Sequence, residues 1–205
     1  NQQGLADLYA VRYEDMEELI RISNINDFLF CPVSIYFHGL MDGADRTMIQ
    51  SEYQINGTAA HRSVDDGTYT THHDTLLGIE VCSVKYGIIG KIDQFNILTG
   101  VLTERKKHVT AVYPGYIMQL YGQYFGMVEA GYEVKSLRIH SMDDNKNYPI
   151  PHPDESPETV AEFERILDEM HSFDISGYIQ TNEAKCRRCI YEPMCANGGC
   201  YDDKT

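Results

Sequence analysis

The sequence lacks the segments that place a chain in or across a membrane. Its 205 residues contain no run of about 18 apolar residues, which a membrane-spanning helix needs. The opening stretch has neither the basic start nor the apolar core of a signal peptide. From these absences we expect a soluble, cytoplasmic protein. A chain of this length buries a sizeable core in one domain without help from disulfides.

Basic residues are few. The chain has 17 Lys and Arg against 31 Asp and Glu, a formal net charge of −14. This balance excludes a protein that coats nucleic acid by bulk attraction, so any contact with DNA has to be local. Two short basic clusters exist, at residues 104–108 (ERKKH) and 185–188 (KCRR). Solvated surface charge and a local contact with DNA are both open for them.

Six cysteines in a reducing compartment are expected to be metal ligands or small buried apolar residues. Cys82 lies in an apolar run and is expected in the core. Four others crowd into the C-terminal segment: Cys186, Cys189, Cys195 and Cys200. These four thiolates complete a local zinc knot, or else Cys31 joins the first three around an iron–sulfur cluster and leaves Cys200 free. The spacing does not separate the two alternatives.

The hydrophobic pattern predicts an α/β fold without internal repeats. Helices are expected over residues 25–41, with a break at Pro32 beside Cys31, and over 57–67, 114–131 and 157–170. Strands are expected over 78–87, 88–97, 100–109 and 132–141, and residues 143–157 are expected to form a loop.

The residues most typical of a catalytic site lie on a predicted hairpin. If Thr99-Gly100 is a two-residue turn, Asp93 lies opposite Lys106, and Glu104 shares their face of the sheet. Two carboxylates with a carbonyl and waters suit Mg²⁺ or Mn²⁺, and a nearby ammonium stabilises charge in phosphodiester hydrolysis. A surface ion pair on an edge hairpin explains the same spacing.

Two further positions extend this hypothesis. His61, on the helix predicted over 57–67, offers an imidazole to the same ion, although a lone histidine on a helix is usually structural. Gln119 and Gln123 lie one helical turn apart, opposite the apolar stripe of their helix. They position a phosphate or a water, or they are simply solvated.

These residues, in this order, resemble the CRISPR-associated RecB-like nucleases, which are adaptation enzymes of the PD-(D/E)xK superfamily. The resemblance covers about residues 20–200. The matching segments are NDFLFCPVSIYFHGL with Cys31, GTAAHRSVD with His61, GKID with Asp93, ERK with Glu104 and Lys106, Gln119, and CRRCIYEPMC. The ordered combination is far more specific than any one motif.

The resemblance implies a restriction-endonuclease-like core, a mixed central sheet flanked by helices. The implied ligands of the catalytic ion are His61, Asp93, Glu104 and the carbonyl of Arg105, with Lys106 and Gln119 acting in catalysis. The implied ligands of a four-iron, four-sulfur cluster are Cys31, Cys186, Cys189 and Cys195. This cluster would join the N- and C-terminal segments, about residues 20–55 and 175–200, of a single nuclease domain over 16–205.

The activity that the resemblance implies is cleavage of single-stranded DNA, which trims the overhangs of spacer precursors beside the licensing motif. The implied partner is the CRISPR adaptation integrase. Two features depart from the family pattern: Gln123 stands where a tyrosine is expected, with Tyr124 one step on, and Cys200 is an extra thiol. Residues 1–15, before Met16, match nothing in the pattern and are unassigned, an appended segment being one explanation.

Two other functions remain open at the level of sequence. A RecB-like iron–sulfur nuclease of recombination or repair would be encoded beside helicase genes rather than integrase genes. A largely non-cutting recognition and gating subunit fits the charge of −14, since so acidic a chain holds DNA well only beside a basic partner. In that case a Lys106→Ala protein would still orient integration.

Overall fold

The computed structural model describes residues 19–40 and 74–196, which form two sheets and the helices packed on them. The larger sheet has the order β2-β5-β6-β7-β8, and the smaller sheet has the order β1-β4-β3. The larger sheet contains β2 (Thr75–Leu77), β5 (Gln94–Asn96), β6 (Val101–Lys106), β7 (Ser136–Ser141) and β8 (Lys146–Ile150). The smaller sheet contains β1 (Ile20–Arg21), β3 (Glu80–Ser83) and β4 (Ile88–Lys91). The predicted helix over 57–67 lies outside the described residues.

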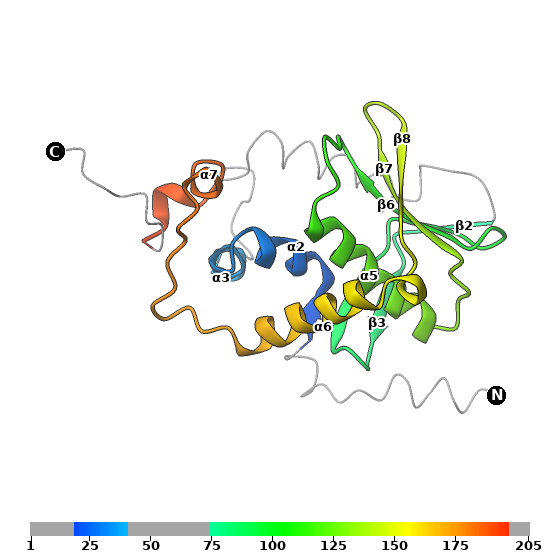
Figure 1. The fold of residues 1–205 in the computed structure, drawn as a ribbon, viewed down its shortest axis with the longest axis horizontal. Coiled ribbons are helices and arrows are strands. Elements are labelled where there is room, and N and C mark those ends of the chain that lie inside the picture. Colours follow the sequence, from blue (N-terminus) through cyan, green and yellow to red (C-terminus); the bar gives the residue numbers. More distant parts are fainter. Residues whose placement is uncertain (1–18, 41–73, 197–205) are drawn as a thin grey trace.

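The helices are α2 (Ile22–Phe30), α3 (Val33–Leu40), α5 (Pro114–Glu129), α6 (Pro157–Ser172) and α7 (Glu183–Cys186), with short 3₁₀ turns η3 (Pro153–Glu155) and η4 (Glu192–Met194). Figure 1 shows the helices together with these sheets, with α7 on the same side of the molecule as α3. Strands β6 and β7 are parallel, and α5 is the crossover between them, whereas the other pairs of the larger sheet are antiparallel. The expected α/β fold, a mixed sheet flanked by helices, is confirmed.

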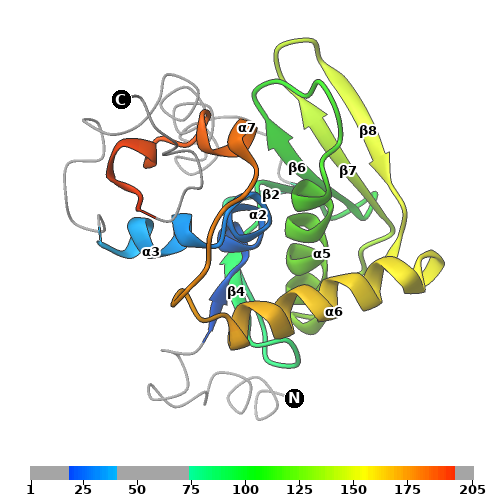
Figure 2. The same ribbon diagram turned by 60° about the vertical axis from the view of Figure 1, so that its left-hand side comes forward.

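Helix α5 is the central helix. It contacts both sheets on one side and α2 and α6 on others, as the turned view in Figure 2 shows. Its glycines permit this close packing. A Cβ atom on Gly126 would lie 2.9 Å from the Cβ of Val81 in β3, and one on Gly122 would lie 3.3 Å from side-chain atoms of Ile22 in α2. The largest fully buried core side chains include Ile22, Ile25, Ile88, Phe95, Leu102, Leu120, Tyr121, Met127, Leu137, Ile139 and Phe163.

The prediction of one continuous strand over 88–97 is wrong. The chain leaves the smaller sheet after Lys91 and enters the larger one at Gln94, so Asp93 lies at the switch between sheets. The predicted two-residue turn is also wrong. β5 ends at Asn96, whose side-chain oxygen accepts the N–H of Thr99 (2.9 Å), and Gly100 closes the turn with φ of +68°.

The register of this hairpin follows from the longer turn. Gln94 pairs with Thr103, which aligns Asp93 with Glu104 rather than with Lys106. Because side chains alternate between faces with a period of two, the two-residue shift leaves both carboxylates on the predicted face. The expectation that residues 143–157 form only a loop is wrong in part, since β8 pairs there with β7 at the sheet edge, where Pro149 is tolerated.

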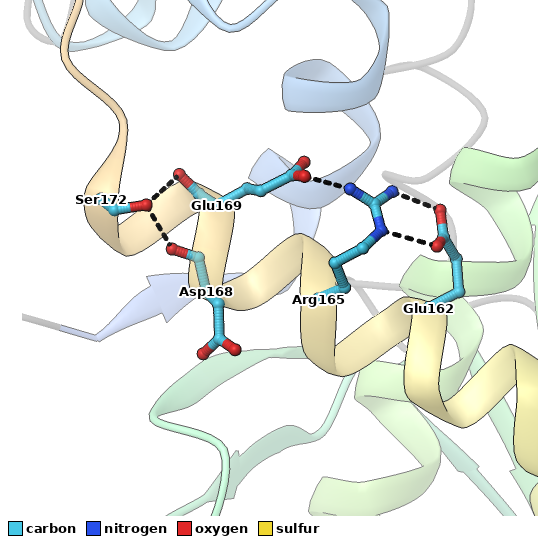
Figure 3. A network of polar contacts seen from close by, with 5 residues as sticks. All are labelled: Glu162, Arg165, Asp168, Glu169 and Ser172. Atoms are coloured by element: carbon cyan, nitrogen blue, oxygen red, sulfur yellow. Dashed lines mark hydrogen bonds and ion pairs between the residues drawn. The ribbon is translucent and has the colours of Figure 1, made fainter.

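Two helix predictions are confirmed. The helical segment at the start breaks between Phe30 and Val33, with Cys31 at the break, and α6 buries Phe163, Ile166 and Leu167. The outer face of α6 carries charge instead. Figure 3 shows Arg165 bonded to the carboxylates of Glu162 and Glu169, and the hydroxyl of Ser172 donating to backbone carbonyls of the preceding turn. These half-exposed ion pairs mark a solvent-facing side.

The C-terminal segment returns to the start of the described chain. Lys185 donates to the carbonyl of Leu29 (3.0 Å), at the end of α2, and Tyr191 stacks on Phe37 of α3 with ring centroids 5.2 Å apart. Phe173 also packs edge-on against Phe28 (5.6 Å). Residues about 150 positions apart are thereby held side by side. Among the described residues no helix is long and apolar enough to cross a membrane.

The contact between α5 and β3 yields a stability prediction. Gly126→Ala places a methyl group against Val81, and we expect it to lower the free energy of unfolding by about 1–3 kcal/mol through overpacking. Gly39→Ala in α3 is the matched control, because a Cβ there meets no atom of the described residues within 4 Å. It should be neutral or stabilising by up to about 1 kcal/mol. Urea unfolding followed by circular dichroism measures both; equal effects would contradict the packing.

Candidate active site

The site is built around Glu104, in the middle of the central strand β6. Its side chain is 0% exposed, and each carboxylate oxygen has its own partner. Gln123 Nε2 donates to Oε2 (2.6 Å), and Lys106 Nζ lies 2.7 Å from Oε1. Burial raises the pKa of Glu104, and the charge of Asp93 adds to the rise, whereas Lys106 and Gln123 oppose it. A buried carboxylate in a central strand excludes the explanation of a surface ion pair.

Asp93 lies beside Glu104 because the chain switches sheets there. Its Oδ2 accepts the backbone N–H of Arg105 in a buried hydrogen bond of 2.7 Å. A residue in a strand directs its N–H and C=O to the same neighbouring strand, so the Arg105 carbonyl faces the Asp93 side as well. The Arg105 side chain is buried on the other face of the sheet, with Nη2 3.1 Å from the sulfur of Met142.

Lys106 connects this pair of carboxylates to α5. Nζ donates to Gln119 Oε1 (3.0 Å) and lies 4.9 Å from the ring centroid of Tyr116. Burial alone would lower the pKa of this ammonium, but the charge and hydrogen bond of Glu104, with Asp93 beyond, raise it above its ordinary value. Its side chain is 18% exposed, so the ammonium lies nearer to solvent than Glu104.

Both glutamines of α5 are bonded to residues of the site, which excludes the alternative that they are simply solvated. Gln119 accepts from Lys106, and the buried Gln123 donates to Glu104 and to the carbonyl of Lys91 (3.2 Å). Their spacing of four residues was the available signal. Tyr116 could not be singled out from the sequence, because an aromatic residue in the first turn of a helix is most often part of the core.

Of the ligands expected for a cation, the structure brings together Asp93, Glu104 and the backbone of Arg105. His61 lies outside the described residues. Within residues 19–40 and 74–196, no three His, Cys, Asp or Glu side chains form a group arranged to hold a metal ion. The two carboxylates and the carbonyl are hard oxygen donors of the type that Mg²⁺ and Mn²⁺ prefer, and they need a further ligand or water to complete a shell.

The cysteines expected to share a cluster lie in two segments that pack together, but no three of the described ones form a group arranged to hold a metal ion. Cys31 ends α2 and is buried, Cys186 ends α7 and is buried, and Cys189 and Cys195 flank η4. Burial raises the pKa of Cys189, and the neighbouring Cys31 and Cys195 raise it further. No disulfide links the described cysteines. Cys200 lies outside the described residues, and Cys82 is half-buried in β3 rather than fully in the core.

The two basic clusters of the sequence differ from a simple surface patch. Arg105 and Lys106 belong to β6, so the first cluster is largely buried, and only His108 at its end is exposed. In the second cluster Lys185 binds a carbonyl of α2, and Arg187 pairs with Glu183 (2.9 Å). Two of the three cations of this cluster are therefore engaged in structural contacts.

Comparison with known proteins places the fold. No protein-family model matches the sequence, and no curated protein matches it. A solved structure titled "Crystal structure of SSO0001" superposes with a TM-score of 0.61, over 94% of this chain and 91% of that one, at 16% identity. At this identity the likeness shows a shared mixed α/β fold.

Two substitutions of Asp93 distinguish the effect of its charge on stability from the effect of its hydrogen bond to the Arg105 N–H. Asp93→Asn keeps an oxygen for the Arg105 N–H and removes the charge beside Glu104. We expect its free energy of unfolding at pH 7 to match the wild type or exceed it by about 1 kcal/mol. Asp93→Ala leaves the buried N–H without its acceptor and should cost about 1–3 kcal/mol. Urea unfolding of the pair is the measurement, and equal losses in both variants would count against this account.

Proposed function

We propose that the chain is a metal-dependent nuclease of the RecB-like type that hydrolyses phosphodiester bonds in DNA. The observation that carries the proposal is the Glu104–Lys106 pair on the central strand, with Asp93 beside it and two glutamines of α5 bonded to it. Buried charges stabilise a fold poorly, and apolar residues of similar size often serve better. A catalytic role therefore explains this group of buried charged residues better than a contribution to stability does.

The donors fit a divalent cation. Asp93, Glu104 and the Arg105 carbonyl would hold Mg²⁺ or Mn²⁺, with His61 as the implied further ligand. The cation would polarise a phosphodiester oxygen and lower the pKa of the attacking water. Hydrolysis forms a bond from the water oxygen to phosphorus and breaks the bond from phosphorus to the leaving oxygen.

The contribution of Lys106 follows from its contacts. Glu104 and Gln119 hold Nζ from two sides, and Tyr116 lies beneath it. A permanently charged ammonium held in this way stabilises the negative charge that develops on the phosphoryl oxygens. Gln119 positions the ammonium rather than the substrate.

The finer part of the proposal concerns substrate and partner. The mixed sheet with its buried carboxylates and the four-cysteine pattern of the sequence support a nuclease that trims single-stranded overhangs of spacer precursors in CRISPR adaptation, together with the integrase, in the cytoplasm. The acidity of the chain supports this dependence on a partner, because a net charge of −14 holds DNA poorly by itself. The spacing of the cysteines and the packing of the C-terminal segment against α2 and α3 support a four-iron, four-sulfur cluster on Cys31, Cys186, Cys189 and Cys195.

Neighbouring lysines test the activity. Lys106→Ala should lower the initial rate of Mn²⁺-dependent cleavage of single-stranded DNA by at least about 100-fold, because it removes a charge that acts on the transition state. Lys107→Ala is the matched control and should retain the wild-type rate. The measurement uses an end-labelled oligonucleotide with the metal saturating. Unchanged cleavage by the Lys106→Ala protein would sink the proposal.

The cluster has its own test. Anaerobically purified protein should contain iron and sulfide and absorb broadly in the visible range. Cys31→Ser should remove that absorption and lower the melting temperature, since the cluster closes a very long loop. Cys82→Ser is the control and should keep the colour, because Cys82 is a half-buried residue of β3 outside the four cluster cysteines. Colourless protein with stoichiometric zinc would contradict an iron–sulfur cluster.

A further inference from the structure

Gln123 makes contacts that differ in kind from those of Gln119. It is 1% exposed, in the buried centre of α5. Its Nε2 donates to Glu104 Oε2 (2.6 Å) and to the Lys91 carbonyl (3.2 Å). Gln119, one turn earlier, accepts from the ammonium of Lys106 instead. One glutamine therefore acts on the cationic group of the site, and the other acts on a carboxylate.

The two acceptors of Gln123 belong to different sheets. Lys91 ends β4 of the smaller sheet, two residues before Asp93, and Glu104 is in β6 of the larger sheet. A single amide thus ties the Glu104 carboxylate to the chain segment that leads into Asp93. It constrains the separation of the two carboxylates at the point where the chain passes from one sheet to the other.

The two partners of Glu104 are not equally buried. Lys106, on Oε1, ends a long side chain that is 18% exposed, so this partner lies toward the solvent. Gln123, on Oε2, is enclosed by the core at 1% exposure. The amide also lacks charge, so it orients the carboxylate without neutralising it.

We propose that Gln123 is a positioning residue for cation binding: it holds Oε2 of Glu104 and thereby leaves Oε1 as the oxygen that binds the divalent cation together with Asp93. This inference rests on the proposed function, because it assigns Glu104 to a metal. Gln123 therefore affects the affinity for the cation, whereas Gln119 affects the position of the Lys106 ammonium. The two glutamines are therefore distinguishable by experiment.

The first experiment measures the initial rate of DNA cleavage against Mn²⁺ concentration. Gln123→Met keeps the volume and removes both donors, and we expect half-saturating Mn²⁺ to rise about 10- to 100-fold, as for other residues that orient metal ligands. The rate at saturating Mn²⁺ should stay within about threefold. Gln119→Met should show the opposite pattern, with a lower saturating rate and unchanged half-saturation. A Gln123→Met protein that needs no more Mn²⁺ than the wild type overturns the inference.

A second readout does not depend on cleavage. Mn²⁺ binding to the full-length protein, followed by electron paramagnetic resonance of the free ion, should weaken about 10-fold in Gln123→Met and be abolished in Asp93→Asn. If Mn²⁺ binding shows these differences between the wild type and the two variants but the wild type does not cut DNA, the nuclease proposal fails and the role of Gln123 stands. If it cuts DNA and Gln123→Met binds Mn²⁺ normally, only the role of Gln123 fails.

A conservative variant covers the case in which Gln123→Met does not fold. Gln123→Asn keeps the amide but shortens the side chain by one methylene, so it cannot reach Glu104 and Lys91 together. Its half-saturating Mn²⁺ should lie at least about threefold above the wild-type value and below that expected for complete loss of the donors. Wild-type affinity in a folded Gln123→Asn protein also overturns the inference.

Discussion

The carboxylate of Glu104 lies in the middle of the central strand with no access to solvent. An ionised group in such a place is costly unless it is paired and hydrogen-bonded. Because burial raises its pKa, the carboxyl reduces the stability of the fold as the pH rises from its unfolded to its folded pKa. Lys106 and Gln123 offset part of this cost, and much of the architecture serves to bring them there.

Helix α5 shows how the fold meets this constraint. Its glycines let it approach α2 and β3 closely, so the helix sits deep enough for its glutamines to reach β6. The sheet switch at Asp93 has the same effect from the other side, because a strand that continued straight would not direct Oδ2 to the Arg105 N–H. Close packing and a broken strand thus produce one polar site inside an apolar core.

The convergence of the carboxylates could be predicted from sequence because side chains alternate along a strand. The predicted register was wrong by two residues. A shift by an even number of residues leaves each side chain on the same face, so Asp93 and Glu104 still share one. The contact between Gln123 and Glu104 could not be predicted, since it depends on how α5 lies across the sheet. Strand β8 was missed because Pro149 and its polar neighbours suggest a loop, and only pairing with β7 makes them a strand. The packing of the C-terminal segment against α2 and α3 depends on contacts between distant parts of the chain and was expected only through a family resemblance.

The central claim is that Asp93 and Glu104 together bind a divalent cation. Crystals soaked in Mn²⁺ and measured at the manganese absorption edge test it most directly. The account predicts one anomalous peak within coordination distance, about 2.0–2.6 Å, of an oxygen from each of these two carboxylates. Ordered manganese elsewhere on the protein, with Glu104 still bonded to Lys106 and Gln123 and no peak beside it, would contradict the claim.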